Sequence, residues 1–287
     1  MNWWDDALHR AAAEAILAGA LAGIIGVHVV LRRLSFFTMA LTHATFPGVV
    51  LASLIGVNIL AGGAAAGTVV ALGVAALSRR QGQNTAAATG VLLSAGFALG
   101  AGLVATHNGF SRDLSAFLVG SILTVTTPDL LLTAVVLAGV STVLLTCARP
   151  LLYTGFDGTG ARVAGFATAF WDIVLLLTIE IVVVTVVPAV GTILAVALIV
   201  APAAAARVWS ARLPMITALA VLFAIASGLG GLYASTRWNI AAGASITLTA
   251  TAILLTSTIL MGVTAVGRGG ARHLSVPHRA GCPGPTR

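Results

Sequence analysis

A histidine in the middle of an apolar stretch is the residue best placed to bind a metal ion. His43 lies within a run from Ser35 to Gly48 that reads SFFTMALTHATFPG. On a helix, a spacing of four residues places Met39, His43 and Pro47 on one face. Pro47 has no N–H group, so the carbonyl of His43 lacks its helical donor. This face therefore offers an imidazole, which suits zinc, copper, iron and nickel, together with a soft thioether and a free carbonyl.

A carboxylate, Glu180, lies midway along a second apolar stretch at residues 169–188. Ionisable residues at membrane depth are costly and mark functional sites by default. Glu180 is therefore either a ligand or the structural partner of another helix. For His43 the alternative is a hydrogen bond to a neighbouring helix beside a purely architectural proline kink. Glu14 and Asp172 lie near the ends of their stretches, and we expect both to reach the membrane interface.

Prolines inside the apolar stretches predict bends. Pro188 and Pro202 each remove a helical N–H donor and leave a carbonyl free four residues earlier. We expect Pro47, its neighbour Gly48, and Pro202 to mark kinks and gating positions.

The elements that carry these residues must be membrane-spanning helices. Of the 287 residues 59% are hydrophobic and 8% charged, against roughly a quarter charged in a soluble domain. This composition excludes a soluble globular protein. A span needs about 20 apolar residues, and the sequence predicts an all-α, polytopic transmembrane helical bundle of about nine spans, within a range of eight to ten. The predicted spans are 11–31, 36–56, 58–77, 86–106, 128–147, 169–188, 190–208, 213–233 and 240–262.

The arginines predict the orientation. All 15 basic residues are arginine. If Arg32 and Arg33 are cytoplasmic, alternation of the spans leaves only Arg10, Arg112 and Arg237 outside. Since cytoplasmic loops are enriched in basic residues, we expect the N-terminus outside and the C-terminus in the cytoplasm.

The spans and their connections divide the chain into two parts. We expect a transmembrane permease domain at 1–266 and a cytoplasmic, disordered tail at 267–287, which is rich in Gly, Pro and Arg. The outer connection at 107–127 contains a half-apolar segment, Leu114–Val125, that is too short to span and suits a re-entrant or surface helix. The inner connection at 149–167 predicts a glycine-broken loop with a short helix that offers a knob to a cytoplasmic partner.

Several function classes are excluded. The sequence contains no lysine, so the nucleotide-binding signature G-x-x-x-x-G-K-[ST] is absent. No Ser/His/Asp or Cys/His arrangement for catalysis stands out, which predicts that the chain is not an enzyme. The basic residues punctuate apolar runs and form no cluster, so nucleic acid is not an expected partner.

Four segments carry a resemblance to a known family. They are Val30–Phe37 with His43, Pro47 and Gly48; Asp113–Leu123; Phe156–Gly165; and Val190–Leu194 with Ala201–Arg207. They resemble, in turn, the first cytoplasmic turn and second helix, the outer segment, the ATPase-docking segment and the late signature of one family. That family is the membrane permeases of ATP-binding-cassette importers for zinc, manganese and iron, and the resemblance extends from about residue 10 to 262.

The resemblance implies a permease subunit in the bacterial inner membrane, without a permanently bound cofactor. A divalent metal ion, zinc, manganese or iron, would pass through it by alternating access, driven by ATP hydrolysis in a separate cytoplasmic ATPase. Further implied partners are an extracellular or periplasmic metal-binding protein and a second copy of the permease. The implied ATPase-docking residues are Phe156, Asp157, Gly158, Ala161 and Gly165, and the implied binding-protein contacts are His107, Arg112 and Asp113.

One position departs from the family pattern. The family usually places an aspartate four residues before the second-helix histidine, where this sequence has Met39. The resemblance supports His43 as a ligand in the transport path, with Glu180 as a candidate for the missing carboxylate and Met39 as a third candidate ligand. Alternatively, Met39 marks a changed metal preference or a path that does not hold the ion by coordination.

Three alternatives to this importer remain open at the level of the sequence. The first is a secondary transporter or channel that works without an ATPase and couples to protons through Glu180. The second is a membrane protein that transports nothing and whose polar groups only fix the packing. The third, within the importer class, is a siderophore or cobalamin permease.

Overall fold

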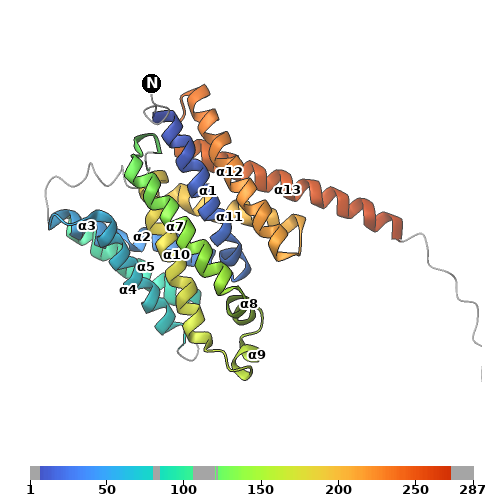
Figure 1. Ribbon diagram of the computed structural model, residues 1–287, viewed down its shortest axis with the longest axis horizontal. Helices are drawn as coiled ribbons and strands as arrows, with labels where there is room; N and C mark the ends of the chain where they lie inside the picture. Colours follow the sequence, from blue (N-terminus) through green and yellow to red (C-terminus); the bar gives the residue numbers. More distant parts are fainter. Residues whose placement is uncertain (1–6, 80–84, 106–119, 121, 273–287) are drawn as a thin grey trace, which may run out of the picture.

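The computed structural model describes residues 7–79, 85–105, 120 and 122–272, with side chains as far as Met261 (Figure 1). Within these ranges the regular elements are all helices, and nine of them are long and apolar enough to cross a membrane. The predicted all-α bundle of nine spans is confirmed.

The nine spans follow the predicted order closely. They are α1 (Ala7–Leu31), α2 with α3 (Ser35–Ala44 and Phe46–Leu54), α4 (Ile59–Leu77), α5 (Thr85–Ala105), α7 (Thr127–Thr146), α10 (Thr168–Val190), α11 (Thr192–Trp209), α12 (Leu213–Trp238) and α13 (Ala242–Arg272). Three short elements connect them: η1 (Ile122–Thr124), α8 (Ala148–Phe156) and α9 (Gly158–Val163).

Local sequence explains where several helices begin and end. The Asn58 side chain accepts a hydrogen bond from the Leu60 N–H at 2.8 Å and caps α4. Thr126 and Asp129 form a reciprocal capping box at the start of α7. Gly191 separates α10 from α11 with φ +88° and ψ 161°, a region that is open almost only to glycine.

The second span is broken near its proline. Thr45 separates α2 from α3, and Pro47 lies in the first turn of α3, where a missing N–H costs no hydrogen bond. The N–H groups of Gly48 and Val49 both bond to the Thr45 carbonyl. The span therefore consists of two helices that meet immediately after His43 and Ala44.

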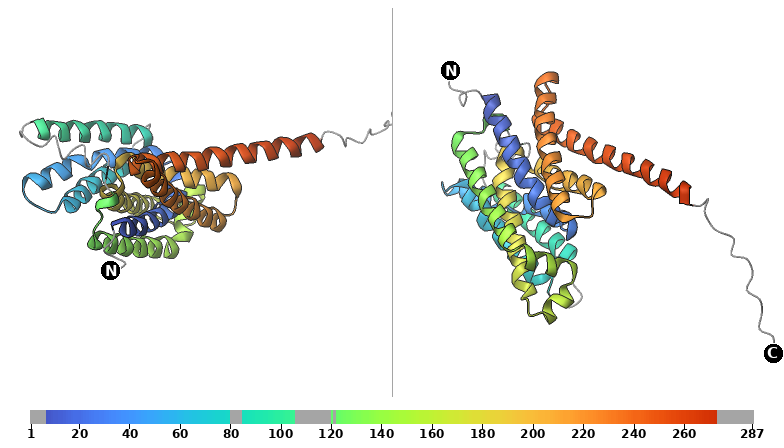
Figure 2. Two further views of the ribbon diagram at one scale, coloured as in Figure 1. Left: turned by 90° about the horizontal axis from the view of Figure 1, so that it is seen from above. Right: turned by 45° about the vertical axis from the view of Figure 1, so that its right-hand side comes forward.

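The helices form two groups with a shared centre. Figures 1 and 2 show α3, α4 and α5 on one side of the bundle and α11, α12 and α13 on the other. Between them lies α1, which contacts α7, α10, α11 and α12, while α10 contacts α4 and α2. Such an arrangement buries the faces of α1 and α10 most completely.

The two ends of the bundle differ. The short helices α8 and α9 lie at the end opposite to the start of α1 (Figure 1). α13 extends beyond the bundle and ends at Arg272, six residues into the segment predicted as a tail, and 273–287 lie outside the described residues (Figure 2).

Candidate functional site

Glu180 is a fully buried carboxylate at the middle of α10. The residue is 1% exposed, and neither carboxylate oxygen has a hydrogen-bond partner among the described residues. Its neighbours Ile179 and Val182 are also fully buried, whereas Ile181 is 51% exposed, so Glu180 lies on the inward face of α10. Because buried polar groups are normally paired, this carboxylate is available for a cation or a proton.

Glycines of α4 allow this helix to approach the carboxylate. A β-carbon at Gly67 would overlap the carboxylate of Glu180. One turn nearer the start of α4, Gly63 faces Val184, and a β-carbon there would lie 3.9 Å from Val184 Cγ1. Pro188 cannot donate to the Val184 carbonyl, so α10 carries a carbonyl without its usual donor one turn after Glu180. We call this contact between α4 and α10 the α4–α10 seam.

His43 lies at the end of α2, beside the break at Thr45. The imidazole is half-buried, and Met39, one turn earlier, is 38% exposed. The face that was predicted to offer an imidazole and a thioether is therefore partly open in the single chain.

His43 and Glu180 lie on neighbouring helices, because α2 packs against both α10 and α4. No hydrogen bond or ion pair joins them in the described part of the chain. Nor does any group of three or more His, Cys, Asp or Glu side chains within those ranges have the placement needed to hold a metal ion. An ion held by either residue would need further ligands, such as carbonyl groups or water.

The inner connection contains two short helices, whereas the sequence predicted a loop with a single short helix. The predicted short helix corresponds to α9, and the structure adds α8 before it. Phe156, at the end of α8, is 73% exposed, whereas Ala161 is fully buried. The Asp157 side chain accepts a hydrogen bond from the Gly160 N–H at 2.8 Å, and this caps α9. Gly158 begins α9.

This α8–α9 segment presents an exposed apolar surface. A groove of about 440 Å³ lies between α8 and the turn that follows α9, and Tyr153, Phe156 and Phe166 contribute its aromatic lining. Gly165 follows with φ +85° and turns the chain toward α10. The segment thus has the exposed aromatic character expected of a surface that contacts a protein.

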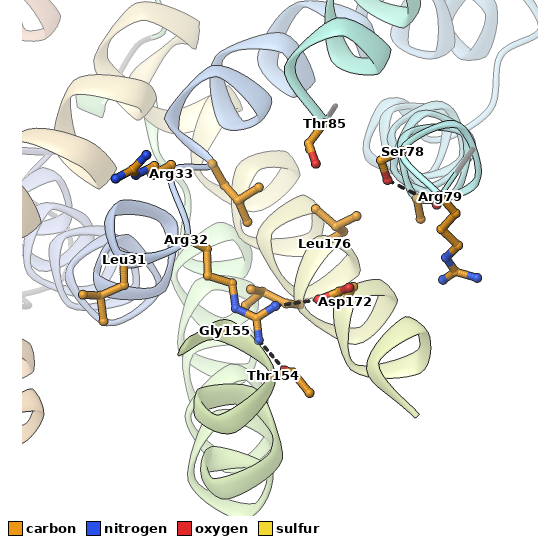
Figure 3. Close-up of a pocket in the computed structure, with 13 residues that line it drawn as sticks. Leu31, Arg32, Arg33, Ser78, Arg79, Thr85, Thr154, Gly155, Asp172 and Leu176 are labelled. Atoms are coloured by element: carbon orange, nitrogen blue, oxygen red, sulfur yellow. Dashed lines mark hydrogen bonds and ion pairs between the residues drawn. The ribbon is translucent and has the colours of Figure 1, made fainter. Parts of the chain in front are cut away.

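Arg32 joins three segments, a role that sequence spacing did not predict (Figure 3). Its guanidinium lies 2.7 Å from Asp172 Oδ1 at the base of α10, and it donates to Thr154 Oγ1 at 2.7 Å and to the Leu151 carbonyl in α8. The Arg32 side chain is 12% exposed and that of Asp172 51%. Glu180 lies eight residues after Asp172, about 12 Å further along the same helix. Arg32 therefore attaches α8 to the helix that carries the buried carboxylate.

Of the remaining predicted site residues, two lie in described helices and three lie outside the described residues. Gly48 lies in α3 and Pro202 is buried within α11, which runs through it without a break. His107, Arg112 and Asp113 lie outside the described residues.

Comparisons with known proteins give a consistent result. The ABC 3 transport family matches residues 4–261. The manganese transport system membrane protein MntC of Halalkalibacterium halodurans is 34% identical over 246 residues, which cover 86% of this chain and 84% of that protein. The zinc transport system membrane protein TroC of Treponema pallidum is 34% identical over 271 residues and 89% of each chain.

A solved structure supports the same assignment. It is that of PsaBC from Streptococcus pneumoniae in complex with Fab, and the chain matches it with a TM-score of 0.78 and 32% identity. The match covers 87% of this chain and 90% of the other. Both the helical arrangement and the sequence are therefore shared along most of the length.

Proposed function

Because this chain belongs to the ABC 3 transport family, we propose that it is the permease subunit through which an ATP-driven importer passes a divalent metal ion. The chain is a multi-pass membrane protein and a transport subunit rather than an enzyme. One observation carries the proposal: Glu180 places a buried, unpartnered carboxylate midway along a central span.

The proposed path follows α2, α4 and α10. Glu180 supplies a carboxylate, and His43, on the neighbouring helix α2, supplies an imidazole. Relatives named for manganese and zinc make these two ions the first candidates, with iron as a further one. Transport requires binding strong enough to admit an ion and weak enough to release it, which is consistent with so few ligands.

ATP hydrolysis is assigned to a separate cytoplasmic subunit. The exposed aromatic surface of the α8–α9 segment supports docking there, and the arginine distribution supports a cytoplasmic location for this end of the bundle. An outer metal-binding protein delivers the ion, and a second permease copy completes the transporter. Arg32 contacts both Thr154 in α8 and Asp172 at the base of α10, so it transmits movement of the α8–α9 segment to α10.

The test is metal uptake by cells that express the chain with its native ATPase and binding protein. Labelled manganese, zinc and iron are supplied singly at limiting concentration, and an ATPase variant unable to hydrolyse ATP serves as the control. We expect ATP-dependent uptake of at least one ion, and a fall with His43→Ala and with Glu180→Gln at equal membrane abundance. Unchanged uptake in both variants refutes the proposed path, whereas uptake that persists with the inactive ATPase favours a proton-coupled transporter.

A further inference from the structure

A second buried carboxylate lies at the opposite end of the bundle from the α8–α9 segment. Glu14 of α1 was expected to reach the membrane interface, but the structure buries it completely. Its Oε1 atom accepts a hydrogen bond from Thr133 Oγ1 at 3.0 Å, and its Oε2 atom has no hydrogen-bond partner among the described residues. The cause is the packing of α1 against α7, which covers this position of the helix.

Glu14 lines a small cavity of about 90 Å³ whose lining is part polar and part apolar. Thr133 lines it with Glu14 and is likewise buried, whereas Asp129 and Thr124 line it from exposed positions. The cavity therefore has a buried floor and an open rim. A water molecule needs about 10–15 Å³ of such space, so the cavity has room for an ion with part of its hydration shell.

Asp129 is held in a fixed orientation at this rim. Its Oδ2 atom accepts hydrogen bonds from the Thr126 N–H at 2.9 Å and from Thr126 Oγ1 at 2.6 Å. Arg10, one turn before Glu14 on α1, donates through Nε to the Val125 carbonyl at 3.1 Å. Among the described residues, two carboxylates thus line the cavity, and the Arg10 guanidinium lies beside it without lining it.

One wall of the cavity belongs to α10, the helix that carries Glu180. Thr185 and Pro188 of α10 form part of its wall. Pro188 is eight residues after Glu180, about 12 Å along the helix. The Val184 carbonyl, which has no helical donor, lies between them. One carbonyl without its usual helical donor therefore lies along α10 between the cavity and Glu180.

We propose that Glu14 and Asp129 form an outer binding site in which a divalent cation is held before it moves along α10 to Glu180. This inference rests on the proposed function and on the predicted orientation, which puts this end of the bundle outside. Among the described residues that line the cavity, the side chains that could bind an ion offer oxygen ligands, namely carboxylates and hydroxyl groups. Manganese, magnesium and calcium favour such ligands, whereas zinc also takes the imidazole available at His43.

The test is equilibrium binding of Mn²⁺ alone to the purified permease–ATPase complex without nucleotide. Glu14→Gln removes the charge but keeps an oxygen that accepts the Thr133 hydrogen bond. We expect the parent to bind an outer and an inner ion per permease chain. In Glu14→Gln the outer ion is lost or weakened by at least about tenfold, and in Glu180→Gln the inner ion is lost.

Asp129→Asn provides a second variant at the exposed rim, in case Glu14→Gln does not fold. Its control on the same helix is Thr142→Ala, which removes an exposed hydroxyl group that donates to the Ala138 carbonyl and does not line the cavity. Loss of the outer ion in the Glu14 or Asp129 variant, with normal binding in the control, supports the site. Parental stoichiometry and affinity in both the Glu14 and Asp129 variants overturn it. If only Glu180→Gln leaves binding unchanged, the inner site of the proposed function fails and the outer site stands.

Discussion

Replacement of Gly67 by alanine tests whether the close approach of α4 to Glu180 matters for transport. A β-carbon at this position would overlap the carboxylate. Either the carboxylate or the α4 backbone must therefore move, and such overpacking costs about 1–3 kcal/mol. The shift displaces the carboxylate that would bind the ion, so we expect occupancy of the proposed site, and uptake at limiting metal, to fall. If the whole cost acts on binding, the fall is about 5- to 150-fold, since 1.4 kcal/mol corresponds to a factor of ten.

Gly63→Ala is the matched control, because it adds the same methyl group on the same helix. A β-carbon there would meet Val49 Cγ2 at 3.3 Å and Val184 Cγ1 at 3.9 Å, contacts that side chains can accommodate. Both variants gain about 1 kcal/mol of helix propensity, so this gain cancels in the comparison. We expect Gly63→Ala to transport at a rate near that of the parent.

A double variant isolates the contact itself. Glu180→Asp shortens the side chain by one methylene group and makes room for the methyl group added at position 67, so uptake by Gly67→Ala/Glu180→Asp should exceed the product of the two single effects. The assay is uptake of labelled metal at limiting concentration, normalised to the amount of folded permease. Equal uptake by Gly67→Ala and Gly63→Ala would refute the role assigned to this contact.

Three further predictions concern stability, measured as thermal denaturation in detergent. Arg32→Ala should lower the free energy of unfolding by about 2 kcal/mol, because hydrogen bonds to Asp172 and α8 are lost. The control Arg33→Gly should be neutral or stabilising, since Arg33 has φ +57°. Equal effects of the two substitutions would contradict the role of Arg32 in stability. Gly191→Ala should cost about 1–3 kcal/mol, because its backbone conformation is strained for alanine; an unchanged melting temperature would show that the turn tolerates a side chain. Glu180→Gln should raise the melting temperature of the metal-free protein, because a buried carboxylate without a partner is costly; a fall would indicate a hidden partner.

The fold was accessible from the sequence because apolar length determines a span. Runs of about 20 apolar residues between arginine, glycine and asparagine breaks identified all nine spans, with bounds within a few residues for most of them. The end of α12 at Trp238 was missed by five residues, because the polar residues Ser235 to Arg237 resemble a loop but continue the helix. Ser235 is buried and donates to the Ile240 carbonyl, which stabilises this extension.

The site was only partly accessible, because periodicity places residues on a helix face but not against another helix. Glu180 could be recognised from its depth in a span, and His43 from its position before a proline. Burial of Glu14 depends on the packing of α7 against α1, and Arg32 acquires its partners from α8 and α10. Such contacts join residues more than 100 positions apart, and no local pattern records them.

The most direct test of ion passage past Glu180 is metal accumulation in sealed proteoliposomes that contain the permease and its ATPase. The metal-loaded binding protein is supplied on the outer face, ATP is supplied on the ATPase face, and the parent is compared with Glu180→Gln. We expect ATP-dependent accumulation by the parent, and accumulation reduced by at least about tenfold in Glu180→Gln while ATP hydrolysis continues. Accumulation by Glu180→Gln at the parental rate would contradict the proposal that the ion passes the buried carboxylate of α10.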